Sequence, residues 1–176
     1  MKLANKVAIV TGAGRNIGEE IAVLFAKEGA RVAVVDMDEE RANSVTRRIK
    51  DDGGEAVSIK CDVSDVADIA KMVSSTIEAF DGVDILVNNV AVSDNKDIFE
   101  LTEEEWRKTI DITLSSPFYV TKQVASWMVA NDRGGKIINI GSTSGFKGRP
   151  TALAYTAAKG GVFNLTQSLA VQLAPY

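Results

Sequence analysis

The segment VAIVTGAGRNIG at residues 7–18 decides the fold, because a short apolar run passes directly into a glycine-rich turn. Residues 7–10 are apolar on both faces, which is typical of a strand buried in a parallel sheet. Glycine permits a positive φ and a close approach of the backbone to a ligand. Helical periodicity begins at about residue 17, so free N–H groups and the positive end of a helix dipole face the turn. The segment predicts a strand–turn–helix unit suited to a pyrophosphate group.

The glycine spacing departs from the usual nucleotide-binding pattern by one position. The fingerprint G-x-G-x-x-G requires its third glycine at position 17, but Ile17 stands there and the glycine follows as Gly18. Taken alone, the segment fits a glycine-rich turn without a ligand as well as it fits a nucleotide site.

Further apolar runs alternate with segments of helical spacing along the chain. Such alternation is typical of right-handed βαβ units. It predicts an α/β fold, a Rossmann-like doubly wound parallel sheet with helices on both faces, in three layers. We expect residues 1–176 to form a single dinucleotide-binding domain, since no linker or repeat interrupts them. The expected strands cover residues 7–10, 31–35, 56–59, 83–87 and 136–140, and the expected helices cover about 17–28, 39–52, 65–80, 102–131 and 152–174.

Composition excludes several classes of function. Apolar residues make up 45% and charged residues 25%, the balance of a globular protein, and a net charge of −4 without basic runs argues against nucleic acid or anionic membranes as partners. No stretch approaches the roughly 18 apolar residues of a membrane span. The absence of histidine and the single cysteine, Cys61, argue against a metal site and a Ser-His-Asp triad. One cysteine also excludes an internal disulfide, so we expect a reducing, cytoplasmic location.

The long helix expected over residues 102–131 has a marked start, because Thr102 and Glu105 are spaced as a capping box. Pro117 lies inside this helix and should kink it or free a carbonyl four residues back. A buried face is predicted by the apolar residues that recur every four positions: Trp106, Ile110, Leu114 and Phe118.

The second strand ends in Asp36, 24 residues after Gly12. An acidic side chain at this position accepts hydrogen bonds from a ribose 2′-hydroxyl and repels a 2′-phosphate. Asp36 could instead only begin the acidic helix cap of residues 36–40, and the two roles are compatible. Arg15 favours the opposite cofactor, because a basic side chain in the turn could meet a 2′-phosphate. The expected position of Asp36 beside the ribose makes NAD, rather than NADP, the predicted cofactor.

Candidate acid/base residues follow the fifth strand. Tyr155 lies thirteen residues after Ser142, and Lys159 follows at i+4, on the same face of a helix. A neighbouring ammonium favours the phenolate that proton transfer requires, and a serine hydroxyl can hold a substrate carbonyl or alcohol. Because lysine is common in this chain, the Tyr-x-x-x-Lys spacing alone is weak evidence.

Taken in order, these features resemble the short-chain dehydrogenase/reductase family, of the classical type. The resemblance extends over essentially the whole chain and implies an oxidoreductase that transfers hydride between NAD(H) and a secondary alcohol or ketone. It rests on residues that occur in the family's order: Thr11-Gly12 to Gly18, Asp36, Cys61-Asp62-Val63, Asn88-Asn89, Trp106, Asn139, Ser142 and Tyr155-Thr156-Ala157-Ala158-Lys159.

The resemblance implies a role for each matching residue. Tyr155 would be the acid/base, Lys159 would favour its phenolate and hold the nicotinamide ribose, and Ser142 would polarise the substrate oxygen. Asp36 would bind the adenosine ribose, and Asn89 the ribose side of the fourth strand. The remaining cofactor contacts would come from Asp62 and Val63 at the adenine and from Gly12, Arg15, Asn16, Ile17 and Gly18 at the pyrophosphate.

Four departures from the family pattern bear on these roles. Asn16 replaces a glycine of the turn, although asparagine tolerates a left-handed φ. Val90 and Ala91 are larger than the residues that usually follow the paired asparagines. Thr113 stands where the family has an asparagine that anchors a proton-relay water, and a threonine hydroxyl can still hold water. Family members continue into two further strands and a substrate-covering loop, so we expect a C-terminally truncated member whose fifth strand is a sheet edge.

Two functions follow from these observations. The first is NAD-dependent hydride transfer on a small-molecule carbonyl or alcohol substrate. The alternative is a catalytically impaired dinucleotide-binding or assembly module. It is suggested by Thr113 and by the two further strands into which the chains of family members continue after the position equivalent to residue 176. A homodimer or homotetramer is expected from the apolar side chains of the last two long helices: Phe118, Trp127, Met128, Phe163, Leu165 and Leu169.

Overall fold

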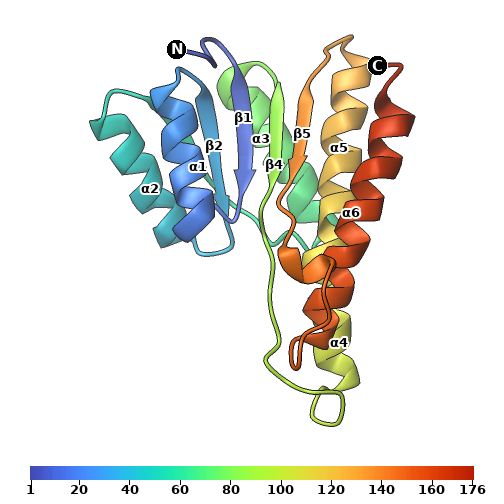
Figure 1. The fold of residues 1–176 in the computed structure, drawn as a ribbon. Helices are drawn as coiled ribbons and strands as arrows, with labels where there is room; N and C mark the ends of the chain where they lie inside the picture. The colour runs from blue at the N-terminus through green and yellow to red at the C-terminus, as the bar shows by residue number, and fades with distance from the viewer.

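A computed structural model describes all residues of the chain, Met1–Tyr176 (Figure 1). The five strands are β1 (Val7–Thr11), β2 (Arg31–Asp36), β3 (Glu55–Lys60), β4 (Ile85–Asn88) and β5 (Lys136–Asn139). The six α-helices are α1 (Asn16–Lys27), α2 (Glu39–Asp51), α3 (Val66–Phe80), α4 (Glu103–Ile110), α5 (Ser116–Ala130) and α6 (Leu153–Leu173). The strands are all parallel and lie in the order β3-β2-β1-β4-β5, which confirms the doubly wound sheet.

Two hydrophobic clusters, one on each face, hold the helices against the sheet. The first packs α1 and α2 and includes Val10, Val23 and Ile49. The second packs α3 and α5 and includes Ile9 and Met72. Successive side chains of a strand point to opposite faces, so Ile9 and Val10 enter different clusters. Figure 1 shows α1 and α2 in front of the sheet and α3 behind it, which explains why β1, β2 and β4 each have three or more consecutive apolar residues.

The helix expected over residues 102–131 is interrupted near its middle. A π-helical turn at Asp111–Ser115 separates α4 from α5, and Pro117 lies in the first turn of α5. Proline has no N–H to donate to the carbonyl of Thr113, so the regular ladder cannot continue there. The capping box of Thr102 and Glu105 at the start of α4 is confirmed.

The prediction that Trp106 and Phe118 lie on a buried face of this helix is wrong. Trp106 is 38% exposed and Phe118 is 42% exposed, whereas the short polar side chains of Thr109, Thr113 and Ser116 are buried. The π-helical turn rotates the residues before it relative to those after it, so one row of apolar positions cannot face the interior along both segments. In Figure 1, α4 also lies beyond the ends of the strands, where no sheet face covers it.

The order of strands reverses between β1 and β4, since β2 and β3 lie on one side of this pair and β5 on the other. In open parallel sheets, ligands bind at the carboxyl ends of the strands beside such a reversal. The loops after β1 and β4 meet at this position. The expected edge position of β5 is confirmed, and its Ile138 is 41% exposed. No helix combines the length and the apolar character that a membrane span requires.

Cys61, the single cysteine of the chain, follows β3. The thiol is buried, and burial together with the neighbouring Asp68 raises its pKa to about 12. The thiolate is the reactive form, and at pH 8 a thiol of that pKa is about one part in ten thousand ionised. We expect an aromatic disulfide reagent to label the native protein no faster than it unfolds, and to label the denatured protein at once. Rapid labelling with an unchanged circular dichroism spectrum would contradict this.

Candidate active site

The turn after β1 adopts the positive φ values that its glycine and asparagine were expected to allow. Gly12 has φ of 61° and Asn16 has φ of 53°, so asparagine does occupy a left-handed position here. Arg15, Asn16 and Ile17 are exposed, and Ile17 keeps 63% of its surface open to solvent. Arg15 is the cap residue of α1 and provides no side-chain hydrogen bond to the helix. The first amides of α1 therefore face the turn without a side-chain acceptor from their own cap.

Asn89, directly after β4, holds this turn in place. Its Nδ2 donates to the carbonyls of Thr11 and Gly12, each at 3.1 Å, and its backbone N–H donates to Thr11 Oγ1 at 3.1 Å. The Thr11 hydroxyl in turn donates to the carbonyl of Val87 at 3.2 Å. Val90, one of the residues that departs from the family pattern by its larger size, packs against Gly12 from the same side. The ends of β1 and β4 thus form one rigid unit.

Asp36 lies beside the turn and does not cap α2. Its Oδ2 accepts the N–H of Gly14 at 2.9 Å, and its Oδ1 accepts the N–H of Asp38 at 3.0 Å. The N-cap of α2 is Asp38, which accepts the N–H of Arg41. Asp36 therefore precedes the cap of α2 and supports its N-cap residue, while its other oxygen is held by the turn after β1. Its carboxylate is half-buried, and each oxygen retains a lone pair for a further donor.

The two residues expected at the adenine differ in what they present. Asp62 accepts both the N–H and the hydroxyl of Ser64, at 2.9 and 2.7 Å, and so stabilises the turn after β3. The side chain of Val63 is buried in the hydrophobic cluster behind the sheet. Only the backbone of Val63 is left to meet a ligand at this position.

Tyr155 and Lys159 are brought together on the first two turns of α6. Lys159 is 3% exposed, its Nζ donates to the carbonyl of Ile140, and it lies 5.9 Å from the centroid of the Tyr155 ring. Burial lowers the pKa of the Lys159 ammonium, because the charged form loses hydration. The backbone of Gly145, in the β5–α6 connection, packs so closely on Lys159 that an added Cβ would lie 2.8 Å from its carbonyl oxygen.

Ser142 opens that connection and caps its short 3-10 turn, Thr143–Gly145. Its Oγ accepts the N–H of Ser144 at 3.1 Å, so the hydroxyl proton is not used by this contact. The connection that Ser142 opens packs on α6, the helix of Tyr155, through Gly145. The serine therefore retains a donor for an oxygen atom bound beside it.

Thr113 is fully buried in the π-helical turn, and its hydroxyl is occupied. Oγ1 donates to the carbonyl of Val92 and accepts the N–H of the same residue, both at 3.1 Å. Its single proton is spent on Val92, so the hydroxyl cannot also donate to a water. The structure assigns Thr113 to holding the β4–α4 connection.

Sequence reasoning missed two groups that contact the pair on α6. One is the carbonyl of Ile140, which accepts from Lys159, and the other is the carboxylate of Asp94, which accepts the N–H of Tyr155 at 3.1 Å. Asp94 lies 61 positions before Tyr155, in a connection without a motif, so no local pattern links the two.

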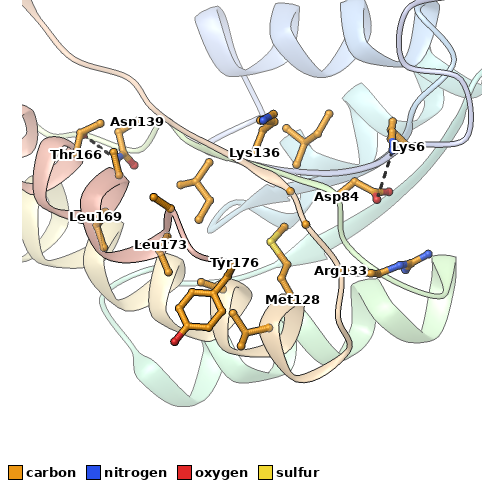
Figure 2. Close-up of a pocket in the computed structure, with 18 of the residues that line it drawn as sticks. Lys6, Asp84, Met128, Arg133, Lys136, Asn139, Thr166, Leu169, Leu173 and Tyr176 are labelled. Carbon is orange, nitrogen blue, oxygen red and sulfur yellow. Dashed lines mark hydrogen bonds and ion pairs between the residues drawn. The ribbon is translucent and has the colours of Figure 1, made fainter.

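A hollow of about 740 Å³ lies elsewhere, at the amino ends of β1, β4 and β5 (Figure 2). Lys6 and Asp84 line one side, with Lys6 Nζ 3.9 Å from Asp84 Oδ1. The other side is lined by Leu173, in the last turn of α6, and by Tyr176, which follows the helix. None of the expected catalytic or cofactor-binding residues lines it. In parallel sheets the ligand site is at the carboxyl ends, so this hollow is not the candidate active site.

Comparisons with known proteins agree with the fold. The family model for short chain dehydrogenases matches residues 6–176. An uncharacterized oxidoreductase of Thermotoga maritima is 42% identical over 174 residues, which cover 99% of this chain and 68% of that protein. Galactitol 2-dehydrogenase of Agrobacterium fabrum is 43% identical over 173 residues, which cover 98% of this chain and 66% of that protein.

Among solved structures, NAD+-bound xylitol dehydrogenase superposes with a TM-score of 0.95 at 33% identity, covering 100% of this chain and 68% of that one. The chain therefore spans about two thirds of the length of its relatives. A matching family model over nearly every residue, the doubly wound sheet and the ordered site residues lead to one conclusion: the chain belongs to the short chain dehydrogenase family.

Proposed function

We propose that this chain transfers hydride between NAD(H) and a secondary alcohol or the corresponding ketone, with Tyr155 as the acid/base. The observation that carries the proposal is the buried ammonium of Lys159, one helical turn from Tyr155 and held on the carbonyl of Ile140. Membership of an oxidoreductase family supports this chemistry. Since the relatives include a galactitol and a xylitol dehydrogenase, polyhydric alcohols are the first substrates to test.

The residues after β1 and β2 fit a dinucleotide. A Cβ on Gly14 would lie 2.7 Å from Asp36 Oδ2, and a Cβ on Gly18 would lie 2.6 Å from Asn89 Nδ2, so only glycine keeps this cradle open. The turn would hold the pyrophosphate, Asp36 the adenosine ribose and Lys159 the nicotinamide ribose. Bound NAD would supply the carbon that accepts the hydride.

Proton transfer is the work of the protein's own side chains. In oxidation, Tyr155 Oη takes the proton of the substrate hydroxyl, and in reduction it returns that proton. The Lys159 ammonium beside the ring favours the phenolate form. Ser142 donates its unused hydroxyl proton to the substrate oxygen and holds it beside Tyr155.

A second candidate function rests on Thr113. Because its hydroxyl is engaged with Val92, the relay that the family builds at this position lacks its usual side chain. A dinucleotide-binding module without turnover would bind NADH and leave the absorbance of the reduced nicotinamide unchanged with every ketone offered.

We further propose that residues 1–176 act as one dinucleotide-binding domain in a cytoplasmic homodimer or homotetramer. Both hydrophobic clusters share the same sheet, which supports a single domain. The exposed Phe118 supports an oligomer, but Met128 does not, because it is buried in the core rather than on the surface where we expected it.

Replacement of the acid/base tests the proposal most directly. Tyr155→Phe removes one oxygen and should lower kcat by about 10²–10⁴-fold, the usual value of a general acid/base. Binding of NADH should stay within a factor of two, since the bond from Lys159 to Ile140 does not involve the phenol. Oxidation of polyhydric alcohols is followed by reduced-nicotinamide absorbance. Tyr119→Phe, which removes the same atom on α5, is the matched control, and equal rates for the two variants would refute the mechanism.

Cofactor choice should follow Asp36. The carboxylate can accept from both ribose hydroxyls of NAD but repels a 2′-phosphate, so NADH should bind at least about ten-fold more tightly than NADPH. Asp36→Ala should weaken NADH binding and narrow that ratio. Fluorescence titration with each reduced cofactor measures both constants. Tighter binding of NADPH to the unaltered protein would make Arg15 the deciding residue instead.

The glycine cradle should be intolerant of a single methyl group. Gly18→Ala places a Cβ against Asn89 Nδ2 and the carbonyl of Gly12, and overpacking of this kind costs about 1–3 kcal/mol. We expect a lower Tm and at least a ten-fold loss of NADH affinity. Gly148→Ala is the control, because nothing lies within 4 Å of the added atom. Unchanged NADH binding by the folded Gly18→Ala variant would place the cofactor elsewhere.

A further inference from the structure

The first turn of α6 is capped by residues from a distant connection. The helix begins after Ala152, which has φ of 67° and offers no side-chain acceptor. The N–H of Tyr155 therefore has no partner within its own segment. Asp94 Oδ1, in the β4–α4 connection, accepts that N–H at 3.1 Å, and the carbonyl of Lys96 accepts the N–H of Ala152 at 3.2 Å.

The connection that carries Asp94 is held on both sides of it. Val92 is bonded twice to the buried hydroxyl of Thr113. Lys96 forms an ion pair with Glu105 and donates a hydrogen bond to its carboxylate. This bond, together with the one that Glu105 accepts from the N–H of Thr102, lowers the pKa of Glu105 to about 2. Figure 1 shows this connection running beyond the sheet to α4, beside the start of α6. Asp94 thus reaches α6 from a fixed support rather than from a free loop.

The surroundings of Asp94 indicate a purpose other than stability. Its second oxygen, Oδ2, is buried and has no hydrogen-bond partner, and the hydroxyl of Thr156, beside Tyr155, is buried without a partner as well. Buried polar atoms of this kind carry a desolvation penalty. A neutral cap residue at position 152 would satisfy the helix without that penalty.

We propose that Asp94 is a positioning residue that fixes Tyr155 relative to Lys159. This inference rests on the proposed function, in which Tyr155 is the acid/base. Lys159 lies one turn further along α6 and is anchored separately on Ile140, so loss of the Asp94 contact would free Tyr155 while Lys159 stays in place. The phenol would then sample positions away from the substrate oxygen, which lowers the rate without altering the cofactor contacts.

The test compares variants at two acidic positions of the same connection. Asp94→Ala should lower kcat by about 10–100-fold, the cost of misplacing a reacting group by about 1 Å, with the dissociation constant of NADH unchanged. Asp94→Asn keeps an acceptor oxygen and should restore kcat to within about three-fold, since asparagine caps helices as well as aspartate does. Asp97→Ala is the matched control, because Asp97 caps only the exposed amides of Phe99 and Glu100. A kcat for Asp94→Ala equal to that of Asp97→Ala overturns the proposal.

A double variant separates positioning from general damage. In the Tyr155→Phe background, Asp94→Ala should change the residual rate by less than about two-fold, since the group it positions is gone. A full additional loss there would show that Asp94 acts on the fold as a whole. Asp94→Ser, which keeps a polar side chain, replaces Asp94→Ala if the alanine variant is not folded, with the same expected outcomes.

Hydrogen exchange of the Tyr155 amide gives a reading that does not depend on turnover. We expect exchange at least about ten-fold faster in Asp94→Ala than in Asp97→Ala, because the opened amide loses its acceptor. If the unaltered protein binds NADH but turns over no substrate, the proposed function fails, and the exchange rates still decide whether Asp94 holds Tyr155. Equal exchange in the two variants overturns the proposal even where turnover is normal.

Discussion

The pairing of β1 with β4 is the constraint on which the rest of the molecule depends. These neighbours in the sheet are far apart in the sequence, and their carboxyl ends are joined by Asn89, which bonds to both Thr11 and Gly12. The preceding residue, Asn88, continues the connection sideways: its Nδ2 donates to Thr121 on α5 at 3.1 Å and to Asn139 on β5 at 2.8 Å. Asn139 donates in turn to Thr166 on α6 at 2.9 Å.

The hydrogen bonds from Asn88 to Asn139 and from Asn139 to Thr166 tie the register of β4 and β5 to the position of α6. An amide withdrawn from water is costly unless its donors and acceptors are paired, so the buried Asn88 and the half-buried Asn139 fit only when β4 and β5 are in register. That register places Ile140 where its carbonyl accepts the Lys159 ammonium. A polar network behind the site thereby determines the position of a charge within it.

Most of the polar groups at the carboxyl edge are occupied by the backbone. Asp36, Ser142 and Thr113 each accept backbone N–H groups. These contacts orient side chains that would otherwise rotate. The lone pairs and hydroxyl protons that remain unpaired are then available to a ligand. Tyr155 differs, because Asp94 holds its backbone N–H while its ring contacts the ammonium of Lys159.

The sequence by itself determined the parallel sheet, the strand ends that carry Gly12 and Asp36, and the helix that carries Tyr155 and Lys159, because periodicity, glycine conformations and i+4 spacing are local properties. It failed for the buried face of residues 102–131, where a proline and a π-helical turn changed the helical phase. Only the tertiary structure decided that Thr113 holds Val92 and that Asp94 caps α6. Those bonds join residues from separate segments, and their partners are chosen by packing, for which no spacing along the chain provides a signal.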